Sequence, residues 1–559
     1  MRKTIAALCI TTVVTAAAFI GSTPSPQVTY TPQVPTASRA DGNRVFLEQA
    51  DILHKQSTDS FLIVAGNVIF TKGPMTMTCD SAHYYVETES FDAFGNVSME
   101  QGDTLFIFAD ELNYRGPEQV CYLYADPGKN VRLINRDVTL ETDIFVYDLG
   151  IELGYYTTGG VLYDPKNRLK SLEGEYNPKT KEATFYRSVH LDSRGESDTL
   201  NIYTDTLYYN TVSHVSELTS PSIIVNARGT IYTRNGLYNT ELDTAALYDR
   251  SLVKTPSGRT MTADTIYYDR LGGICECFGY MVLTDSARQA SLSADYGFFN
   301  QSTDSCYATG RLLIKEYSQG DTLYLHGRQL NARRLIDTTL VDSTHVADTT
   351  HVADTTHVAD IWPRVRLFRS DVQGICDSMR VTSADSTLRM YVAPVLWSEE
   401  RQIYGNIIEL HFNDSTIDYA HLPESGFSSQ RIYQDYHDQI SGKEMLATFE
   451  DGHLRRLDIN GNVELIMFPE ENDSTFNKMV TAQSSFLQAY FRDNTTEYIK
   501  MWPETTGVAT PLFLLRRSML FLSKFRLFEG MRPLSPLDVL VIPEAMDALM
   551  NETPRPQPK

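Results

Sequence analysis

The stretch Thr78-Cys79-Asp80-Ser81-Ala82-His83-Tyr84 decides the fold, because its Asp and its Tyr recur together along the chain. One position returns about every 30 residues and is followed four residues later by an aromatic ring in eight consecutive units. This repeat position is occupied by Asp80, Asp110, Asp143, Leu172, Asp205, Arg234, Asp264 and Asp295, and the rings are Tyr84, Tyr114, Tyr147, Tyr176, Tyr209, Tyr238, Tyr268 and Phe299. Aromatic residues make up only 11% of the sequence, so eight rings in eight units indicate a repeated structural unit.

A third column lies two residues after each repeat position and holds Ala82, Leu112, Phe145, Gly174, Leu207, Gly236, Ile266 and Gly297. Side chains in a strand alternate between its faces, so the repeat position, the +2 column and the +4 ring are expected on one side. By default this inward column is packed core. Its glycines would leave space between two sheets, and that space either closes or holds something apolar.

Gly66-Asn67-Val68 and Gly95-Asn96-Val97 open a short strand about a dozen residues before each longer strand of the repeat. Gly and Asn tolerate the positive φ of tight turns, so these pairs predict hairpin turns. The predicted fold is all-β: repeated β-hairpins stacked into an open two-sheet β-jellyroll, in two blocks joined by a low-complexity linker.

Composition divides the chain into six predicted segments. These are a signal peptide (1–21), a Pro/Ser/Thr linker (22–44), a first β block (45–335), a low-complexity linker (336–360), a second β block (361–510) and a basic-apolar tail (511–559). The linker contains tandem His-Val-Ala-Asp-Thr-Thr units, which favour a solvated tether over a metal-binding tract. Within the tail, Leu512 to Phe528 is a helix candidate that could lie on a membrane surface, dock on a partner or cap the last strands.

The charge balance and the N-terminus limit the classes of function. Basic residues number 49 against 71 acidic ones, and the resulting net charge of −22 makes a nucleic-acid partner improbable. Met1-Arg2-Lys3 precedes an apolar run from Ile5 to Ile20, the pattern of a secretory signal, with an uncleaved anchor as the alternative. We therefore expect an exported, periplasmic protein, with a membrane association left open.

Catalytic and metal-binding patterns are not recognisable in the sequence. It contains no Gly-rich phosphate loop, no His-Glu-x-x-His and no Gly-x-Ser-x-Gly, and its aspartates are explained by the repeat, where they can bond nearby backbone N–H groups. Six cysteines follow the signal, and the best interpretation is that they are small buried residues, although disulfides are permitted in an exported protein. Cys275 and Cys277 lie two apart in a strand, face the same way and cannot readily bond to each other. We expect no enzyme activity, no cofactor and no metal.

The repeated Ala/Thr-Asp-x-Φ-x-Tyr strands, seen at 78–84, 108–114 and 262–268, together with the Gly-Asn-Val openings, resemble the OstA-like family of lipopolysaccharide-transport β-jellyrolls. The resemblance is good over residues 45–335 and weak over 361–500. It implies an open two-sheet interior that holds the acyl chains of a lipopolysaccharide-type glycolipid and carries them toward the outer membrane. The expected lipid-binding residues are the inward positions Leu112, Tyr114, Phe145, Tyr147, Leu207, Tyr209, Ile266 and Tyr268.

Partners implied by the resemblance are the glycolipid, other β-jellyroll transport proteins or a second copy joined through edge strands, and the outer-membrane translocon. The first edge, Val45 to Leu53, carries few charges and no proline, so it suits strand addition. The chain lacks a C-terminal run of barrel strands of its own. Its net charge of −22 indicates that an anionic glycolipid would be gripped by its acyl chains with the head outside, or through divalent cations.

Two other classes of function remain open at this stage. A β-helical surface adhesin or polysaccharide-active protein would also be a repeated β structure, but its rungs are usually shorter than 30 residues and hold several short strands. A scaffold with a dry, closed core is the third possibility. Lipids that co-purify with the intact protein would distinguish these classes.

Overall fold

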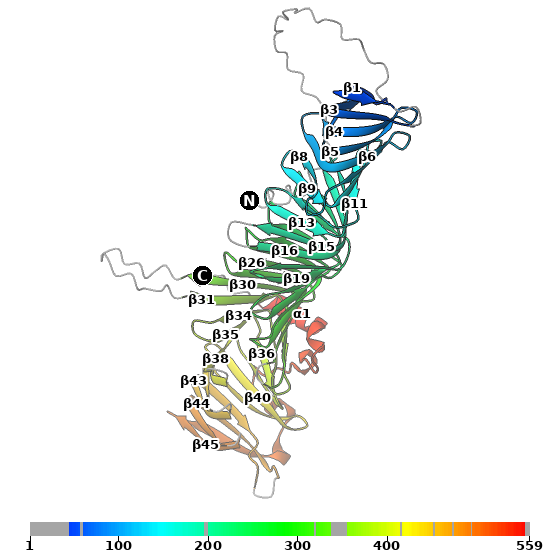
Figure 1. Cartoon of the computed structure of the whole chain (residues 1–559). Helices are drawn as coiled ribbons and strands as arrows, with labels where there is room; N and C mark the ends of the chain where they lie inside the picture. The colour runs from blue at the N-terminus through cyan, green and yellow to red at the C-terminus, as the bar shows by residue number, and fades with distance from the viewer. Residues whose placement is uncertain are drawn as a thin grey trace, which may run out of the picture. The chain divides into compact units, whose positions relative to one another are not determined.

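The computed structural model describes residues 44–55, 60–194, 199–317, 320–336, 355–413, 416–450, 453–471, 475–492 and 495–553. The predicted signal peptide, nearly all of the Pro/Ser/Thr linker and the first two His-Val-Ala-Asp units lie outside these residues. From Val45 onward the chain forms one compact unit. It is built almost wholly of β-strands, so the all-β prediction is confirmed (Figure 1).

The strands pair antiparallel, both with a neighbour in the chain and with a strand of another hairpin, as β7 does with β10 and β9 with β12. Up to residue 336 they are β1 (Phe46–Gln49), β2 (Ile52–His54), β3 (Leu62–Lys72), β4 (Met75–Tyr85), β5 (Ser90–Gln101), β6 (Leu105–Arg115), β7 (Val120–Tyr124), β8 (Val131–Asn135), β9 (Val138–Thr142), β10 (Ile144–Asp148), β11 (Leu153–Tyr156), β12 (Gly160–Tyr163), β13 (Asn167–Ser171), β14 (Glu173–Asn177), β15 (Glu182–Arg194), β16 (Thr199–Asn210), β17 (Val215–Leu218), β18 (Ser222–Asn226), β19 (Gly229–Thr233), β20 (Asn235–Asn239), β21 (Thr244–Tyr248), β22 (Leu252–Lys254), β23 (Arg259–Thr262), β24 (Thr265–Asp269), β25 (Ile274–Asp285), β26 (Ala290–Asn300), β27 (Ser305–Thr309), β28 (Leu313–Glu316), β29 (Leu323–His326) and β30 (Gln329–Ile336). From residue 355 they are β31 (Thr355–Trp362), β32 (Val365–Phe368), β33 (Gln373–Cys376), β34 (Ser378–Thr382), β35 (Thr387–Tyr391), β36 (Val395–Ser398), β37 (Arg401–Tyr404), β38 (Ile407–Asn413), β39 (Thr416–Leu422), β40 (Gly426–Tyr433), β41 (Tyr436–Gly442), β42 (Glu444–Glu450), β43 (His453–Met467), β44 (Lys478–Arg492), β45 (Thr495–Trp502) and β46 (Thr506–Pro511).

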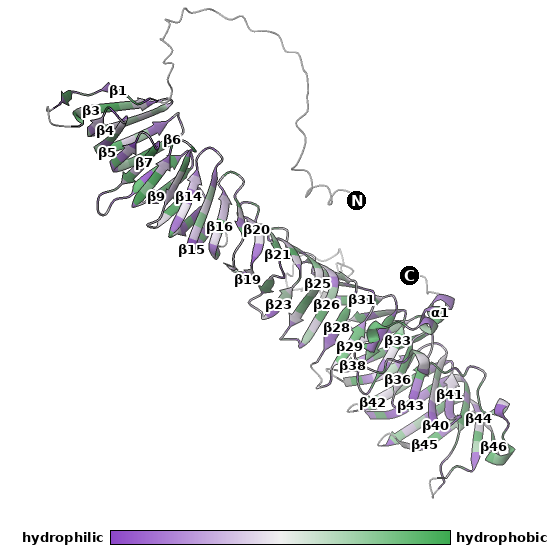
Figure 2. Ribbon diagram, turned by 90° about the vertical axis from the view of Figure 1, so that its right-hand side faces the viewer, coloured by the Kyte–Doolittle hydropathy of each residue, from purple (hydrophilic) through white to green (hydrophobic). Residues whose placement is uncertain are grey.

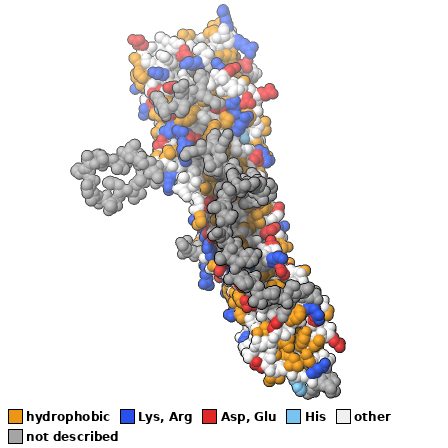
Figure 3. Space-filling view, turned by 90° about the horizontal axis from the view of Figure 1, so that it is seen from above, with side chains coloured by type: hydrophobic (Ala, Val, Ile, Leu, Met, Phe, Trp, Pro, Cys, Tyr) orange, Lys and Arg blue, Asp and Glu red, His pale blue; other side chains and the backbone are white. Residues whose placement is uncertain are grey.

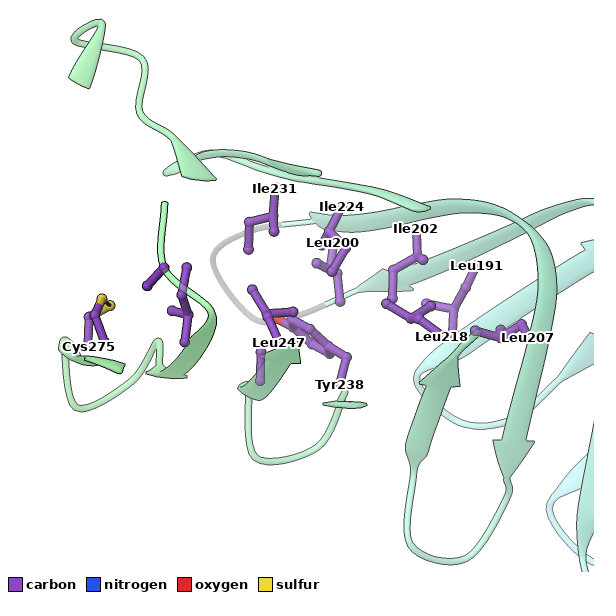
Figure 4. Packing of buried hydrophobic residues seen from close by; sticks show 14 of the residues in the cluster. Leu191, Leu200, Ile202, Leu207, Leu218, Ile224, Ile231, Tyr238, Leu247 and Cys275 are labelled. Atoms are coloured by element: carbon purple, nitrogen blue, oxygen red, sulfur yellow. Dashed lines mark hydrogen bonds between the residues drawn. The ribbon is translucent and has the colours of Figure 1, made fainter. Parts of the chain in front are cut away.

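Long strands such as β5 and β6 bend in the middle and belong to two layers. The second half of β6 pairs with β7, whereas its first half pairs with β8. We call the layer that contains β7, β10, β14, β20 and β24 the ring layer, because it carries the +4 rings, and the layer that contains β8, β9, β13, β18 and β22 the facing layer. Apolar side chains of the two layers, among them Ile202 and Ile224 of the facing layer and Leu207 and Leu218 of the ring layer, form the core between them (Figure 4). Along the strands, apolar and polar residues alternate (Figure 2).

The Gly-Asn pairs are bends within strands, so the prediction that they are hairpin turns is wrong. In β5, Gly95 has φ 74° and Asn96 has φ 46°, and the pairing with β6 shifts register between Phe94 and Val97. Two consecutive residues in the left-handed region form a β-bulge, which bends a strand and increases its twist. Here the bulge passes one strand from the ring layer to the facing layer.

The same bulge turns the repeat position outward. Asp80 is exposed and Leu172, which occupies the same position in a later unit, is 48% exposed, whereas Ala82 is fully buried. The sequence predicted that the repeat position and the +2 column face one side, and this is wrong for the repeat position. The inward parity changes between Cys79 and Ala82 because the pairing of β4 with β5 shifts register between Thr78 and Ser81.

The strands on either side of the low-complexity segment, β30 and β31, pair with each other in the ring layer. Strands β30 and β31 pair from Gln329↔Trp362 to Ile336↔Thr355, so the third His-Val-Ala-Asp unit, His357 to Asp360, is part of a strand. The predicted linker therefore ends before Thr355 and not at Asp360. The alternation Val358 inward, Asp360 outward suits a strand, since Val358 is 5% exposed. Pairing and core continue from one predicted block into the other.

The tail crosses the outer surface of the facing layer, the side turned away from the interior. We call residues 512–552 the strap. It contains the short 3-10 turns η1 (Leu512–Leu514), η2 (Arg517–Met519), η3 (Glu529–Met531) and η4 (Asp538–Leu540) and the helix α1 (Glu544–Glu552). The predicted helix from Leu512 to Phe528 is thus wrong. No helix of the described chain has the length and apolar character needed to cross a membrane.

The six cysteines after residue 44 carry free thiols, and five of them are buried. Cys275 and Cys277 face the same side of β25, with their sulfur atoms 3.9 Å apart. The interpretation of these residues as small core side chains agrees with this placement.

Candidate functional site

The predicted lipid-binding residues line the inner surface of the ring layer. Seven of the eight are at most 2% exposed, and Tyr268 is partly buried. Cross-strand pairing joins them in two adjacent rows. The +2 row runs through Leu112↔Leu123↔Phe145 and, further along, Leu207↔Leu218↔Gly236↔Leu247↔Ile266, and the ring row runs through Tyr114↔Cys121↔Tyr147 and Tyr209↔Ser216↔Tyr238↔Ala245↔Tyr268.

The ring row alternates large and small side chains, which the sequence pattern alone did not reveal. From Tyr114 onward the residues between successive rings are Cys121, Gly154, Ala183, Ser216, Ala245 and Cys275, whereas Phe91 stands between Tyr84 and Tyr114. A small residue between two rings leaves volume for them without overpacking the layer. The signal was present in the sequence, because each small residue lies in the strand that pairs with the ring strand.

The glycines of the interior are covered by neighbouring side chains. The Tyr156 ring lies over Gly174, Phe145 lies over Gly154, and the Met281 sulfur lies over Gly297, so close that an added Cβ at each glycine would stand within 2.1–2.6 Å of these atoms. Of the two outcomes expected for the space above the glycines, the packing shows closure. An acyl chain between the layers would have to displace these side chains or part the layers.

Polar contacts join the two layers along the edge that carries the ring hydroxyls. Lys72 Nζ donates to the Tyr114 hydroxyl at 2.7 Å, the Tyr147 hydroxyl donates to Gln101 at 3.2 Å, and Asn135 and Asn167 donate to the hydroxyls of Tyr176 and Tyr209 at 3.0 and 2.7 Å. The partners come from the hairpin ends of the facing layer, 41–46 residues away in sequence. We call these four contacts the tyrosine seam.

Burial sets the electrostatics of the seam. It raises the pKa of the hydroxyls of Tyr114, Tyr147 and Tyr209, and it lowers the pKa of Lys72. The tyrosines therefore remain neutral donors and acceptors over the physiological range. Asn135 and Asn167 are each 2% exposed, so the seam excludes water from the interior on this side.

A cavity lies between the layers at the β1 end of the interior. Its volume is about 20 Å³, room for about one water molecule, and it is lined mainly by apolar side chains, among them Phe70, Met75, Met77, Phe91 and the predicted residue Tyr114. Lys72 reaches the same space. Of the residues that line this cavity, the lipid-site prediction named only Tyr114. Phe70 could have been found, because it ends the Gly66-Asn67-Val68-Ile69-Phe70 opening.

The described residues hold no cluster of three or more His, Cys, Asp or Glu suited to a metal ion. The inner surfaces offer apolar contacts and a few neutral or single polar groups. Such a surface can bind an apolar chain and orient one polar group.

Comparison with known proteins agrees with the repeat motifs. Residues 42–196 match the family model described as OstA-like protein. No curated protein sequence matches the chain. A solved structure, that of LptH, described as the LptA homologous periplasmic component of the conserved lipopolysaccharide transport device from Pseudomonas aeruginosa, is similar over 25% of this chain and 79% of its own, at 11% identity and a TM-score of 0.15. A TM-score this low supports no statement about function. The OstA-like resemblance predicted from the repeated motifs is therefore confirmed by the family model over residues 42–196 of this chain.

Proposed function

We propose that this protein is a non-enzymatic, exported carrier that binds a lipopolysaccharide-type glycolipid and passes it through the periplasm toward the outer membrane. The observation that carries the proposal is the OstA-like match over residues 42–196, which coincides with the part of the stack that holds the cavity and the first rings. The apolar inner rows supply a continuous surface on which acyl chains can lie. The parallel β-helix alternative is not supported, because the described strands pair antiparallel.

Acyl chains enter, in this proposal, at the cavity beside β1. There Phe70, Met77 and Phe91 line a small apolar pocket that has to widen to admit a chain, and Lys72 stands where an anionic group of the ligand can meet a cation. Further along the stack the chains occupy the inner rows only when the layers part, and the tyrosine seam opens. The polar head remains outside, because the net charge of −22 repels phosphate groups at longer range.

Photo-crosslinking tests where lipid is held. A photoreactive phenylalanine at Tyr114 or Phe145, in full-length protein isolated from cells that make lipopolysaccharide, should form a lipid adduct. The same probe at Asn113 or Tyr208, which stand on the opposite face of the ring layer, should not. Equal labelling of the two faces, or no lipid adduct from either inward position, would overturn the proposal and favour a closed scaffold.

The first edge of the stack is the proposed docking site for a β-jellyroll partner or a second copy. Strands β1 and β2 both pair with β3, and Ile52 and Leu53 of β2 are 60% and 61% exposed. Replacing Phe46 or Leu47 separately by proline removes one backbone donor each, and because donors alternate in direction along a strand, one of the two points away from β3. If both folded variants still form the same complexes in a pull-down, the edge is not the docking site.

A further inference from the structure

Two glutamine side chains of the facing layer hold the strap by hydrogen bonds to its backbone. Gln439 donates to the Leu520 carbonyl at 2.7 Å and accepts from the Leu522 N–H at 2.8 Å. Gln402 makes the same pair of contacts, as donor to the Arg526 carbonyl and acceptor from the Phe528 N–H. Each amide thus imitates one residue of a neighbouring β-strand, and the strap keeps a fixed side toward the sheet.

The fixed inner side is formed by a few buried residues. Leu520, Phe528, Val539, Met546 and Met550 are at most 8% exposed, and several of them pack on Trp397 and Ile375 of the facing layer. Other apolar side chains of the strap, such as Leu512, Leu515 and Met531, are partly buried against the same clusters.

The outer side of the strap exposes an unusual number of large apolar side chains. Phe513 is 86% exposed, Leu534 76% and Leu537 67%. Leu514, Leu527 and Val541 are each more than half exposed as well. Single exposed apolar residues need no explanation, but six within 29 residues of sequence offer more apolar contact than one segment of a soluble surface usually does.

The positive charge of the strap gathers in its first part. Residues 512–528 carry four Lys and Arg and no acidic residue, whereas residues 529–552 carry one Arg and five acidic residues, in a protein whose net charge is −22. Arg516, Arg517, Lys524 and Arg526 are exposed beside the apolar side chains. On the face drawn in Figure 3, by contrast, acidic and basic side chains are interspersed. Basic residues next to exposed Leu and Phe are complementary to an anionic lipid surface, where the cations meet headgroups and the apolar side chains enter the acyl boundary.

We propose that the outer side of the strap docks the protein on an anionic phospholipid surface. This surface differs from the interior proposed to hold glycolipid, and it lies on the outer side of the facing layer. The proposal does not depend on the proposed carrier function. Its physical basis is that residues 512–528, the basic first part of the strap, can approach a negatively charged bilayer without the repulsion expected of an acidic protein.

Vesicle flotation tests the proposal with the full-length, signal-free protein. The probes are protein-free vesicles of phosphatidylethanolamine with about one third phosphatidylglycerol, and vesicles of phosphatidylcholine alone. We expect at least tenfold more bound protein on the anionic vesicles, and release in high salt, because the Debye length shortens to about 3 Å at 1 M.

Two variants and a matched control locate the contact. F513S/L514S and R516E/R517E should each lower binding at least fivefold, since all four side chains are exposed and make no core contact. The control L242S/L271S removes two leucines of similar exposure, 59% and 72%, from hairpins of the ring layer and should bind normally. If both strap variants bind the vesicles as well as the control and the wild type do, the strap is not the contact. If the wild type binds only native membranes that contain protein, the partner is not a lipid surface.

Discussion

At the residue scale, the repeat aspartates stabilise the bends that divide the two layers. The Asp80 carboxylate accepts from the Asn96 amide at 2.8 Å, and Asp295 accepts from Arg311 Nε at the same distance. Asp80 thus binds the bulge within β5, and Asp295 binds the corner between β27 and β28. The repeat position suits Asp because it lies on the outer side of the bend, where the carboxylate remains in contact with water.

Replacing Gly95 by Ala should test this corner. An added Cβ would stand 2.5 Å from the Asp80 Oδ2 atom, and φ at this position is 74°. We expect a loss of about 2–3 kcal/mol in the free energy of unfolding, measured in urea. Gly102→Ala is the control, because its φ is 61° but no atom lies within 4 Å of the added group. Similar losses for the two variants would contradict the proposed contact between aspartate and bulge.

Asp438 should make the stability depend on pH. Burial raises the pKa of its carboxyl to about 6, although the Phe468 N–H and Arg401 oppose the shift. A carboxyl that holds its proton more tightly in the folded chain costs stability above its folded pKa, and the cost disappears below about pH 4. Asp438→Asn should therefore raise the free energy of unfolding by about 2 kcal/mol at pH 7.5 and by nothing near pH 4. The exposed Asp435→Asn should show no such difference, and a constant gain at both pH values would refute the assignment.

The sequence allowed some of these residues to be predicted and not others. The +2 and +4 positions were placed correctly on the inner surface, because alternation holds within one layer. The outward turn of the repeat position was missed, since a bulge can be made without glycine, as at Arg187 and Ser188, with φ of 62° and 56°. Strand alternation cannot reveal a bend whose residues carry no conformational signature.

At the scale of elements, the path of the strap could not be predicted, because the residues that hold it look like ordinary solvated residues in the sequence. Gln402 and Gln439 occupy outward positions in strands, where a glutamine is normally taken as a solvated residue. They are 2% and 1% exposed because the strap covers them. Only the structure shows that this polar row matches the backbone of a segment more than 80 residues later in sequence.

Removing the two amides should loosen the strap. Gln402→Ala with Gln439→Ala leaves backbone carbonyls and N–H groups of the strap without partners, at about 1–3 kcal/mol per site. Trypsin should then cut after Lys524 and Arg526, which are exposed, many times faster than in the wild type, while the β stack remains intact. Gln434→Ala, an exposed residue in a hairpin, should leave the cleavage rate unchanged. An unchanged rate in the double variant would show that the strap is held by its apolar contacts alone.

The three His-Val-Ala-Asp units have the same sequence, but only the third lies in a strand, β31. Deleting residues 345–350 should change the melting temperature by less than about 1 °C, because shortening a long loop alters its closure entropy only slightly. Val358→Asp, by contrast, puts a charge at a position that is 5% exposed and should cost about 3 kcal/mol or more. Differential scanning fluorimetry of the two variants decides whether the third His-Val-Ala-Asp unit is structural.

At the scale of the whole molecule, the stack from Val45 onward should behave as one particle even when its chain is cut. The β30–β31 pairing spans eight residue pairs, and Leu330 and Ile361 belong to the same core cluster. A protease site inserted between residues 337 and 354 should therefore yield two fragments that co-elute on size exclusion without denaturant and separate in urea. Fragments that part under native conditions would show two independent blocks.

The position of the third His-Val-Ala-Asp unit also bears on how this gene can change. Strand β31 has the sequence Thr-Thr-His-Val-Ala-Asp-Ile-Trp, and its first two residues, Thr355 and Thr356, are the end of the second copy. The first copy ends in the same Thr-Thr. Loss or gain of one six-residue copy by slippage during DNA replication would recreate the same strand sequence and the same inward valine. Because six is an even number, a further copy added to the strand would leave every inward residue inward and every outward residue outward. The hairpin can thus lengthen or shorten over generations in steps of six residues without selection against the fold.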